Sequence, residues 1–255
     1  IFLRATKEIV LSEEIKKLIG TSKRSMSGEE LCRKLLTMKV DMLFNGGVGT
    51  YVKASDENNL DLGDKQNEAV RVDALDLKAR IVCEGGNLGF TQKARIEYAL
   101  RGGKINIDGI DNAGGVNTSD HEVNLKILLN TLEVKGIICK EENCKILEGL
   151  KEQVVNLVLW NNYEQALAIS RDETLSQRYL EQFINAIKIL EENTSSFNRH
   201  DFYIPKNENI EDIINKNGSI VRPVLCSLLS YSKIFMKSIL LKSTLVDEVF
   251  TLKYL

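Results

Sequence analysis

The sequence predicts an α/β fold in which a parallel sheet is followed by an all-α helical region. Glycine supports this division, because 12 of the 17 glycines lie between Gly46 and Gly115 and only three follow Lys135. A glycine inside a helix costs about 1 kcal/mol relative to alanine, so a segment almost free of glycine favours helices. The apolar spacing also changes there, from short runs to a period of 3.6 residues. We therefore expect a sheet domain over residues 1–135 and a helical region over residues 136–255.

Two short helices are expected before the first strand. The segment Ser12–Ile19 has the pattern of a helix that begins with a capping serine and ends at Gly20. A second helix begins at Ser27, because Ser27 and Glu30 have the spacing of a capping box. Its apolar residues are expected on one face: Leu31, Leu35 and Leu36.

Strands and helices then alternate along the first part of the chain. The expected elements, in order, are a strand over Val40–Phe44, a strand over Lys78–Cys83, a helix over Gln92–Leu100 ended by Gly102 and Gly103, a strand over Lys104–Asp108 and a helix over His121–Leu132. Alternation of this kind predicts parallel strand pairing with right-handed crossover connections.

The second part shows three amphipathic helical patterns, each with apolar residues three or four positions apart. The three faces are Leu147, Leu150, Val154 and Leu157; then Leu180, Phe183, Ile187 and Leu190; then Leu225, Leu228 and Phe235. Pro223 stands in the first turn of the third helix, where proline is tolerated. Residues 191–218 are polar and rich in asparagine, and are expected to form a loop interrupted by a short helix.

The composition argues against several classes of partner. The formal net charge is −2, which gives no electrostatic reason to expect nucleic acid or an anionic membrane. No stretch approaches the roughly 18 to 20 uninterrupted apolar residues that cross a bilayer, and the first residues do not resemble a signal peptide, so a cytoplasmic protein is expected. The five cysteines are scattered and there are only two histidines, so neither a metal site nor a histidine-based triad is expected.

Each expected strand is followed by a loop of small residues. The first loop contains Gly46 and Gly47, the second contains Gly86 and Asn87, and the third contains Asn112. In an open parallel sheet such loops meet at the carboxyl edge, where these folds bind ligands. Backbone N–H groups can approach a ligand closely there, and asparagine side chains both donate and accept toward a carboxamide. A tight turn explains any single glycine pair better, so the functional interpretation rests on the recurrence of three loops.

The residues after the third loop allow two interpretations. Ser119 and Asp120 fit the start of a helix, where a side chain caps free N–H groups and acidic residues favour the positive end of the helix dipole. Alternatively, this helix N-terminus receives a carboxylate and the Ser119 hydroxyl donates to it. Serine and aspartate are ordinary capping residues, so the residues alone favour the cap.

Three segments resemble the large bacterial NAD-specific glutamate dehydrogenases. They are VDMLFNGGVGTYVKAS from Val40, EGGNLG from Glu84 and DNAGGVNTSDHE from Asp111. The resemblance is dense from about Val40 to Leu129, and continues more weakly through residues 157–163 and at Arg222. It implies that the chain contains the second half of an NAD-binding domain, with a partial Rossmann-type parallel sheet, followed by part of an all-α C-terminal region.

The resemblance also implies roles for individual residues. Asn87 and Asn112 correspond to asparagines that contact the nicotinamide end of NAD, and the pair Gly46 and Gly47 corresponds to residues that line the cofactor cleft. Val116 and Ser119 correspond to residues near the side chain of glutamate, where the serine donates to the distal carboxylate. For Ser119, this correspondence reverses the preference for a simple cap. The implied substrates are L-glutamate and 2-oxoglutarate.

The same resemblance implies that other parts of the enzyme lie upstream. In that family, the catalytic lysine and aspartate, the lysines that bind carboxylates and the turn that binds pyrophosphate precede the matched segment. No position here matches them, so the chain is expected to have no catalytic residue, to be inactive alone, to act with the upstream part of the same enzyme and to form a homo-oligomer.

Two alternatives stay open at this point. The first is a catalytically inactive remnant or assembly module from a split or decaying gene, which predicts an exposed apolar sheet edge. The second is an unrelated nucleotide-binding module that prefers ATP.

Overall fold

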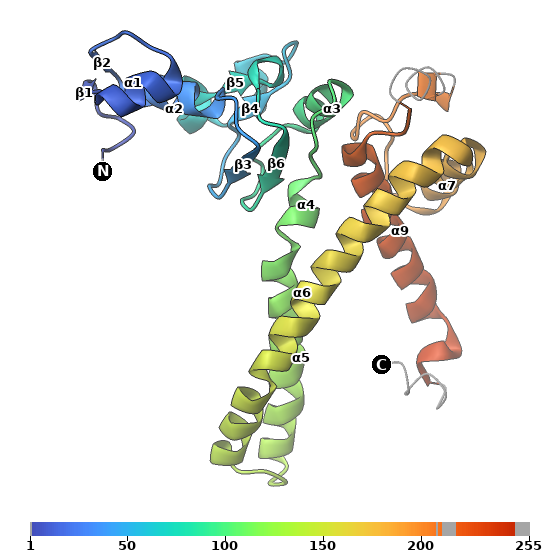
Figure 1. Cartoon of the computed structure of the whole chain (residues 1–255). Helices are drawn as coiled ribbons and strands as arrows, with labels where there is room; N and C mark the ends of the chain where they lie inside the picture. The colour runs from blue at the N-terminus through green and yellow to red at the C-terminus, as the bar shows by residue number, and fades with distance from the viewer. Residues whose placement is uncertain (1, 208, 211–217, 248–255) are drawn as a thin grey trace.

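The computed structural model describes residues 2–207, 209–210 and 218–247. The strands and short helices of residues 2–111 gather at one end of the molecule, and long helices extend away from them (Figure 1). The mixed α/β class, with its helical second part, is therefore confirmed.

A small unit at the N-terminus contains an unexpected pair of strands. Strands β1 (Ile9–Val10) and β2 (Ser25–Met26) pair in antiparallel orientation. Between them, helix α1 (Glu13–Ile19) begins after Ser12, whose side chain accepts from the N–H of the third helical residue. The helix ends at Gly20, which adopts a φ of +64°, a conformation that favours glycine. The predicted helix and both of its ends are confirmed.

Helix α2 (Gly28–Leu36) begins at the predicted capping serine. The Ser27 Oγ accepts from the Glu30 N–H at 3.1 Å. The Glu30 carboxylate accepts from Lys23 Nζ at 2.5 Å. The predicted common apolar face is wrong, because Leu35 is exposed and the other two leucines pack into two separate apolar clusters on either side of the helix.

Two separate two-stranded parallel sheets follow. Strands β3 (Met42–Asn45) and β6 (Ile81–Glu84) pair in parallel along their whole length, which confirms the first two predicted strands and their orientation. A second parallel pair joins β4 (Val52–Lys53) to β5 (Val72–Asp73).

The third predicted strand, Lys104–Asp108, is wrong. Only its first residue forms an isolated parallel bridge, with Ile81, and the chain then enters helix α4 (Asp108–Asp111). The two aspartates of this helix accept from backbone N–H groups, Asp108 from Leu88 at 2.8 Å and Asp111 from Glu84 at 3.0 Å. Bonds from side chain to backbone compete with a strand ladder, so the chain turns here.

Helix α3 (Gln92–Leu100) has the bounds that the sequence predicts. Thr91 caps its start by accepting from Ala94 at 3.0 Å, and Gly102 follows its end with a φ of +89°. Three short 3-10 helices, η1 (Asn59–Leu62), η2 (Lys65–Val70) and η3 (Ala74–Asp76), lie between β4 and β6. The helix and strands share one apolar core, which includes Val52, Ala74, Val82, Phe90, Ala94, Tyr98 and Ile105.

The predicted third glycine loop is helical in the structure. Helix α5 (Ala113–Val134) follows α4 directly and begins well before the predicted start at His121. Gly114 allows a close approach to the next long helix, because a Cβ at this position would lie 3.2 Å from the Asn162 Nδ2. Ser119 therefore lies inside α5, so its predicted position at a helix N-terminus is wrong.

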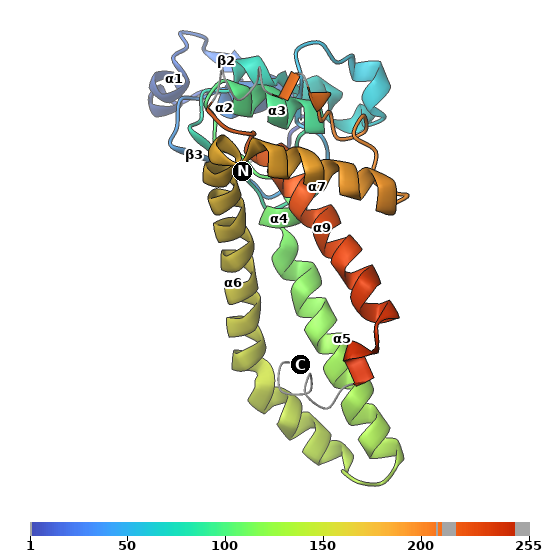
Figure 2. The ribbon, with the colours of Figure 1, turned by 90° about the vertical axis from the view of Figure 1, so that its right-hand side faces the viewer.

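The second part of the chain is helical, as predicted. Helix α6 (Lys140–Arg178) runs antiparallel to α5, and the turn between them is farthest from the strands (Figure 2). Helices α7 (Leu180–Asn193) and α9 (Arg222–Lys242) and the short η4 (Thr244–Asp247) follow. The boundary predicted near Lys135 lies in the turn of the α5–α6 hairpin. The short helix predicted within residues 191–218 falls partly on residues 208 and 211–217, which lie outside the described residues.

A second core joins these helices near the strands. Its buried members include Ile110, Ile169, Ile187, Leu190, Val224, Leu225 and Leu228, so the faces predicted for α7 and α9 are largely confirmed. The face predicted for α6 is wrong at Leu157, which is exposed, while its neighbour Val158 is buried.

By length and composition alone, helix α9 is long and apolar enough to cross a membrane. The prediction that no stretch of the chain approaches this length and composition is therefore wrong. The first residues of α9, from Pro223 to Leu228, are buried in the second core. Only this first part has the burial of a core helix, because residues 229–242 are half-buried or exposed.

Candidate functional site

The loops after β3 and β6 lie against each other through backbone contacts. The Gly86 N–H donates to the Asn45 carbonyl at 2.9 Å, and the Gly49 N–H donates to the Asn87 carbonyl at 3.3 Å. A Cβ at Gly86 would lie 2.2 Å from the Gly47 carbonyl oxygen, which no other residue type allows without movement of the backbone. The sequence therefore needs glycine at Gly86 to bring the two loops together.

The end of helix α4 joins this pair of loops. The Asn112 Nδ2 donates to the Asn87 Oδ1 at 2.6 Å. The three segments that the sequence predicts at one edge of the sheet thus converge, although the third arrives as a helix junction and not as a loop.

These segments border an open cleft of about 830 Å³. One wall comes from the loop of β6 and from α4 and α5, with Asn87, Asn112 and Val116 among its residues. The opposite wall comes from α6 and α9. It consists of Asn161, Glu164, Gln165, Ala168, Leu229 and Lys233. Sequence reasoning missed this helical wall, because nothing in a helical period shows which distant loop the helix will face.

The six predicted site residues fall into three groups. Asn87, Asn112 and Val116 line the cleft, and the Val116 side chain is 68% exposed. Gly46 and Gly47 lie beside the cleft, in the loop that contacts Asn87 and its neighbours. Ser119 is exposed on α5, one turn beyond Val116, and does not line the cleft.

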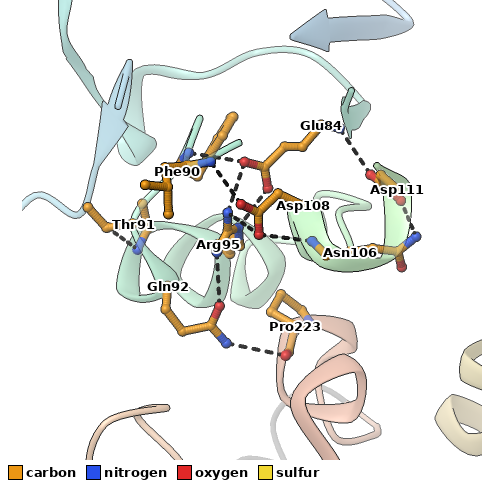
Figure 3. Close-up of polar contacts among 12 residues, drawn as sticks. Glu84, Phe90, Thr91, Gln92, Arg95, Asn106, Asp108, Asp111 and Pro223 are labelled. Atoms are coloured by element: carbon orange, nitrogen blue, oxygen red, sulfur yellow. Dashed lines mark hydrogen bonds and ion pairs between the residues drawn. The ribbon is translucent and has the colours of Figure 1, made fainter. Parts of the chain in front are cut away.

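A buried ion pair between Glu84 and Arg95 supports the loop that follows β6 (Figure 3). Glu84 ends β6 and is fully buried. Its carboxylate accepts from the Arg95 Nε at 2.6 Å and from the Phe90 N–H at 3.1 Å. Burial raises the pKa of Glu84, and the Arg95 guanidinium opposes this shift. The two ends of the turn from Glu84 to Phe90 are thereby fixed to helix α3.

Two aspartates extend this network to the junction of α4 and α5. Asp108 pairs with Arg95 at 3.1 Å and accepts from the Leu88 N–H, and Asp111 accepts from the Glu84 N–H, as Figure 3 shows. The Asn87–Asn112 contact therefore rests on a charged scaffold of four residues that sequence reasoning missed. The available signal was the acidic residue at a strand end followed by an arginine on the next helix.

The helical region is bonded to the same scaffold. The Arg222 Nε donates to the Asn106 Oδ1 at 3.0 Å, and the Gln92 Nε2 donates to the Pro223 carbonyl at 3.2 Å. Asn106 in turn donates to Asp111 at 2.8 Å. The start of α9 is thus fixed to the α3 and α4 side of the cleft, which positions the helical wall.

A separate polar cluster fixes the exit of the first loop. The Asp64 carboxylate accepts from the Thr50 N–H and from the Asn67 Nδ2, each at 2.8 Å. The hydrogen bond from Asn67 is the main reason that the pKa of Asp64 is lowered. The buried Arg71 donates to the Thr50 carbonyl at 2.9 Å.

Two of the thiols, those of Cys83 and Cys226, do not support nucleophilic chemistry. Burial raises the pKa of Cys83 to about 11 and that of Cys226 to about 12, so both are protonated at neutral pH. No group of three or more histidine, cysteine, aspartate or glutamate side chains suited to a metal ion occurs within the described part of the chain.

Comparison with known proteins identifies the family. Residues 1–172 match the family model described as bacterial NAD-glutamate dehydrogenase, catalytic domain. The chain is 39% identical over 248 residues to the NAD-specific glutamate dehydrogenase of Halomonas elongata, 41% identical over 248 residues to that of Pseudomonas aeruginosa and 34% identical over 254 residues to that of Mycobacterium tuberculosis.

Each of these alignments covers 97% of the chain. The chain spans only 15% of the Halomonas and Pseudomonas relatives and 16% of the Mycobacterium relative. The chain belongs to the bacterial NAD-glutamate dehydrogenase family.

Proposed function

We propose that this chain forms the nicotinamide side of the cofactor cleft in an NAD-dependent glutamate dehydrogenase. The full reaction converts L-glutamate, NAD and water to 2-oxoglutarate, ammonium and NADH. The observation that carries the proposal is the Asn87–Asn112 hydrogen bond at the edge of the cleft, next to the glycine loop of β3.

The two asparagines leave suitable groups free for a carboxamide. Because the Asn112 Nδ2 donates to the Asn87 Oδ1, the Asn87 amide nitrogen keeps its donors and the Asn112 amide oxygen keeps its acceptor sites. The carboxamide of nicotinamide needs one acceptor and one donor. The bound cofactor supplies the hydride acceptor, and these residues would hold and orient its ring.

The neighbouring residues fit the same role. Gly46 and Gly47 lie in the loop that contacts Gly86 and Asn87, next to the proposed position of the ring. Val116 presents an apolar surface to the cleft, as the proposal requires near the carbon chain of glutamate. Ser119 does not line the cleft, although its neighbours Asn117 and Asp120 do, so a substrate would have to reach past these residues to contact its hydroxyl.

The rest of the longer enzyme would supply the remaining chemistry. The relatives are more than six times as long as the matched segment, to judge from the 15% that it spans. We propose that the upstream part supplies the catalytic lysine and aspartate and the pyrophosphate turn, so the chain alone should bind cofactor weakly and show no turnover. Glutamate-dependent NADH formation by the isolated chain would contradict this part of the proposal.

Titration of the purified chain with NADH and with ATP tests cofactor binding. We expect NADH to bind to the wild type and to bind about tenfold more weakly to the Asn112→Ala variant. The substitution removes roughly one hydrogen bond between neutral groups and leaves the carboxamide of the cofactor without that partner. Asn156→Ala, an exposed asparagine of α6, is the matched control and should bind as the wild type does. Preference for ATP, or equal NADH affinity in all three proteins, would contradict the proposal.

An assembly module is the second candidate, and one observation favours it. Within the described residues, β3 pairs on one side only, and its Met42 and Phe44 side chains are 56% and 60% exposed. An unpaired apolar edge is typical of an association surface. A chain that forms oligomers in light scattering, loses them in a Phe44→Ser variant and binds no NADH would favour this function over the first.

A further inference from the structure

The helical wall of the cleft presents one cation. Among the described residues that line the cleft, Lys233 of α9 is the only basic one. Its Nζ donates to the Gln165 Oε1 of α6 at 2.6 Å. The two side chains therefore meet across the α6–α9 interface and face the same space as Asn112.

The carboxylates of the cleft do not neutralise this cation. Asp108 is paired with Arg95 at 3.1 Å. Asp120 and Glu164 also line the cleft, but no ion pair within 4.0 Å joins either of them to Lys233 in the described part of the chain.

The helices around Lys233 partly desolvate its ammonium group, which lowers its pKa, although the residue is exposed. A desolvated cation gains from the approach of an anion.

The free hydrogen-bonding groups also select an anion. The Gln165 amide oxygen is occupied by Lys233, so this amide offers its two N–H donors to the cleft. The ammonium keeps two further N–H donors. Donors from two converging side chains, one of them charged, are the usual partners of a carboxylate or phosphate group.

We propose that Lys233 and Gln165 form an anion subsite that binds a carboxylate or phosphate group of the ligand in this cleft. The identity of the ligand rests on the proposed function, since glutamate, 2-oxoglutarate and NAD all carry such groups. The subsite itself rests on the geometry of α6 and α9. It makes the helical region a part of the binding site, in addition to its role as a support.

The test measures binding of NADH, 2-oxoglutarate and inorganic phosphate to the purified chain by calorimetry. Lys233→Met removes the charge and keeps most of the length of the side chain, and Lys233→Arg restores a cation. Lys237→Met is the matched control, because Lys237 is exposed one turn further along α9 and does not line the cleft. We expect Lys233→Met to weaken binding of the anionic ligand about tenfold to a hundredfold, Lys233→Arg to recover most of it and Lys237→Met to change nothing.

The ligand series separates the two sources of the anion. A loss confined to 2-oxoglutarate assigns the subsite to a carboxylate, and a loss confined to NADH and phosphate assigns it to a phosphate. Unchanged affinity of Lys233→Met for every ligand that the wild type binds would overturn the subsite.

A second measurement keeps the subsite testable if the proposed cofactor role fails. Lysines labelled with ¹³C-methyl groups are followed by NMR, and the Lys233 signal is assigned by its loss in Lys233→Arg. Addition of glutarate or inorganic phosphate should raise the pKa of this lysine and leave that of Lys237 unchanged. A wild-type chain that binds no NADH but shows this shift would refute the cofactor role alone, and a chain without the shift would refute the subsite.

Discussion

Different kinds of interaction stabilise the two walls of the cleft. The loop wall has glycine turns held by directional polar contacts to a buried scaffold, in which Glu84 and Arg95 are central. The helical wall is held by apolar packing near the strands, through residues such as Ile187 and Leu225. A single polar substitution can therefore disorder the loop wall, whereas the helical wall loses stability in proportion to the volume of apolar side chain that is removed.

The largest expected effect comes from breaking the buried ion pair. Arg95→Met leaves the fully buried Glu84 without its cation, which should cost about 3 to 5 kcal/mol in the free energy of unfolding. Urea unfolding measures this loss. Lys93→Met, on the exposed side of the same helix and paired with Asp56, is the control and should have a much smaller effect; equal effects would show that burial of the pair is unimportant.

Removing apolar volume from the helical wall should have the next largest effect. Leu225→Ala empties a site that is 1% exposed, and we expect a loss of about 2 to 4 kcal/mol by thermal or urea unfolding. Leu157→Ala on exposed α6 surface is the matched control and should change stability little. If both variants unfold alike, the assigned core is wrong.

A methyl group between the two loops should separate them. Gly86→Ala places a Cβ 2.2 Å from a backbone carbonyl, so we expect a loss of about 1 to 3 kcal/mol and weaker NADH binding. Gly149→Ala, within α6 and with open space around the added Cβ, should instead stabilise the chain by roughly 0.5 to 1 kcal/mol. If Gly86→Ala lowers and Gly149→Ala raises the free energy of unfolding in the same assay, the contrast between loop and helix is supported. Changes of the same sign would refute it.

The smallest effect concerns the polar cluster at the exit of the first loop. Because the pKa of Asp64 in the folded chain is below its ordinary value of 3.8, its ionised form stabilises the fold well above pH 3.8, and this contribution is lost as the pH falls through the lowered pKa. The stability difference between wild type and Asp64→Asn should therefore be constant near neutral pH and shrink in acid. A constant difference down to pH 2 would contradict the linkage.

Local patterns predicted the elements whose residues signal their own ends. Helix α3 has the predicted bounds because Thr91 caps it and Gly102 follows it, and α1 is defined in the same way by Ser12 and Gly20. Asn87 and Asn112 lie together as predicted, although Asn112 follows the short helix α4 and not the expected strand.

The errors arise where tertiary contacts override local signals. The glycines near Gly114 indicate a loop by propensity, yet they lie in α5, where small residues allow contact with α6. The pairing of Lys233 with Gln165 joins residues that are 68 positions apart. No period or spacing along the chain encodes such contacts.

The continuity of α6 has a geometric consequence. This continuous helix of 39 residues is roughly 58 Å long along its path, at about 1.5 Å per residue. Gln165 lies in the half of α6 that is nearer to the strands, and the tip of the α5–α6 hairpin is at the other end of the helix. Residues at the tip are therefore tens of ångströms from Gln165 along one continuous helix.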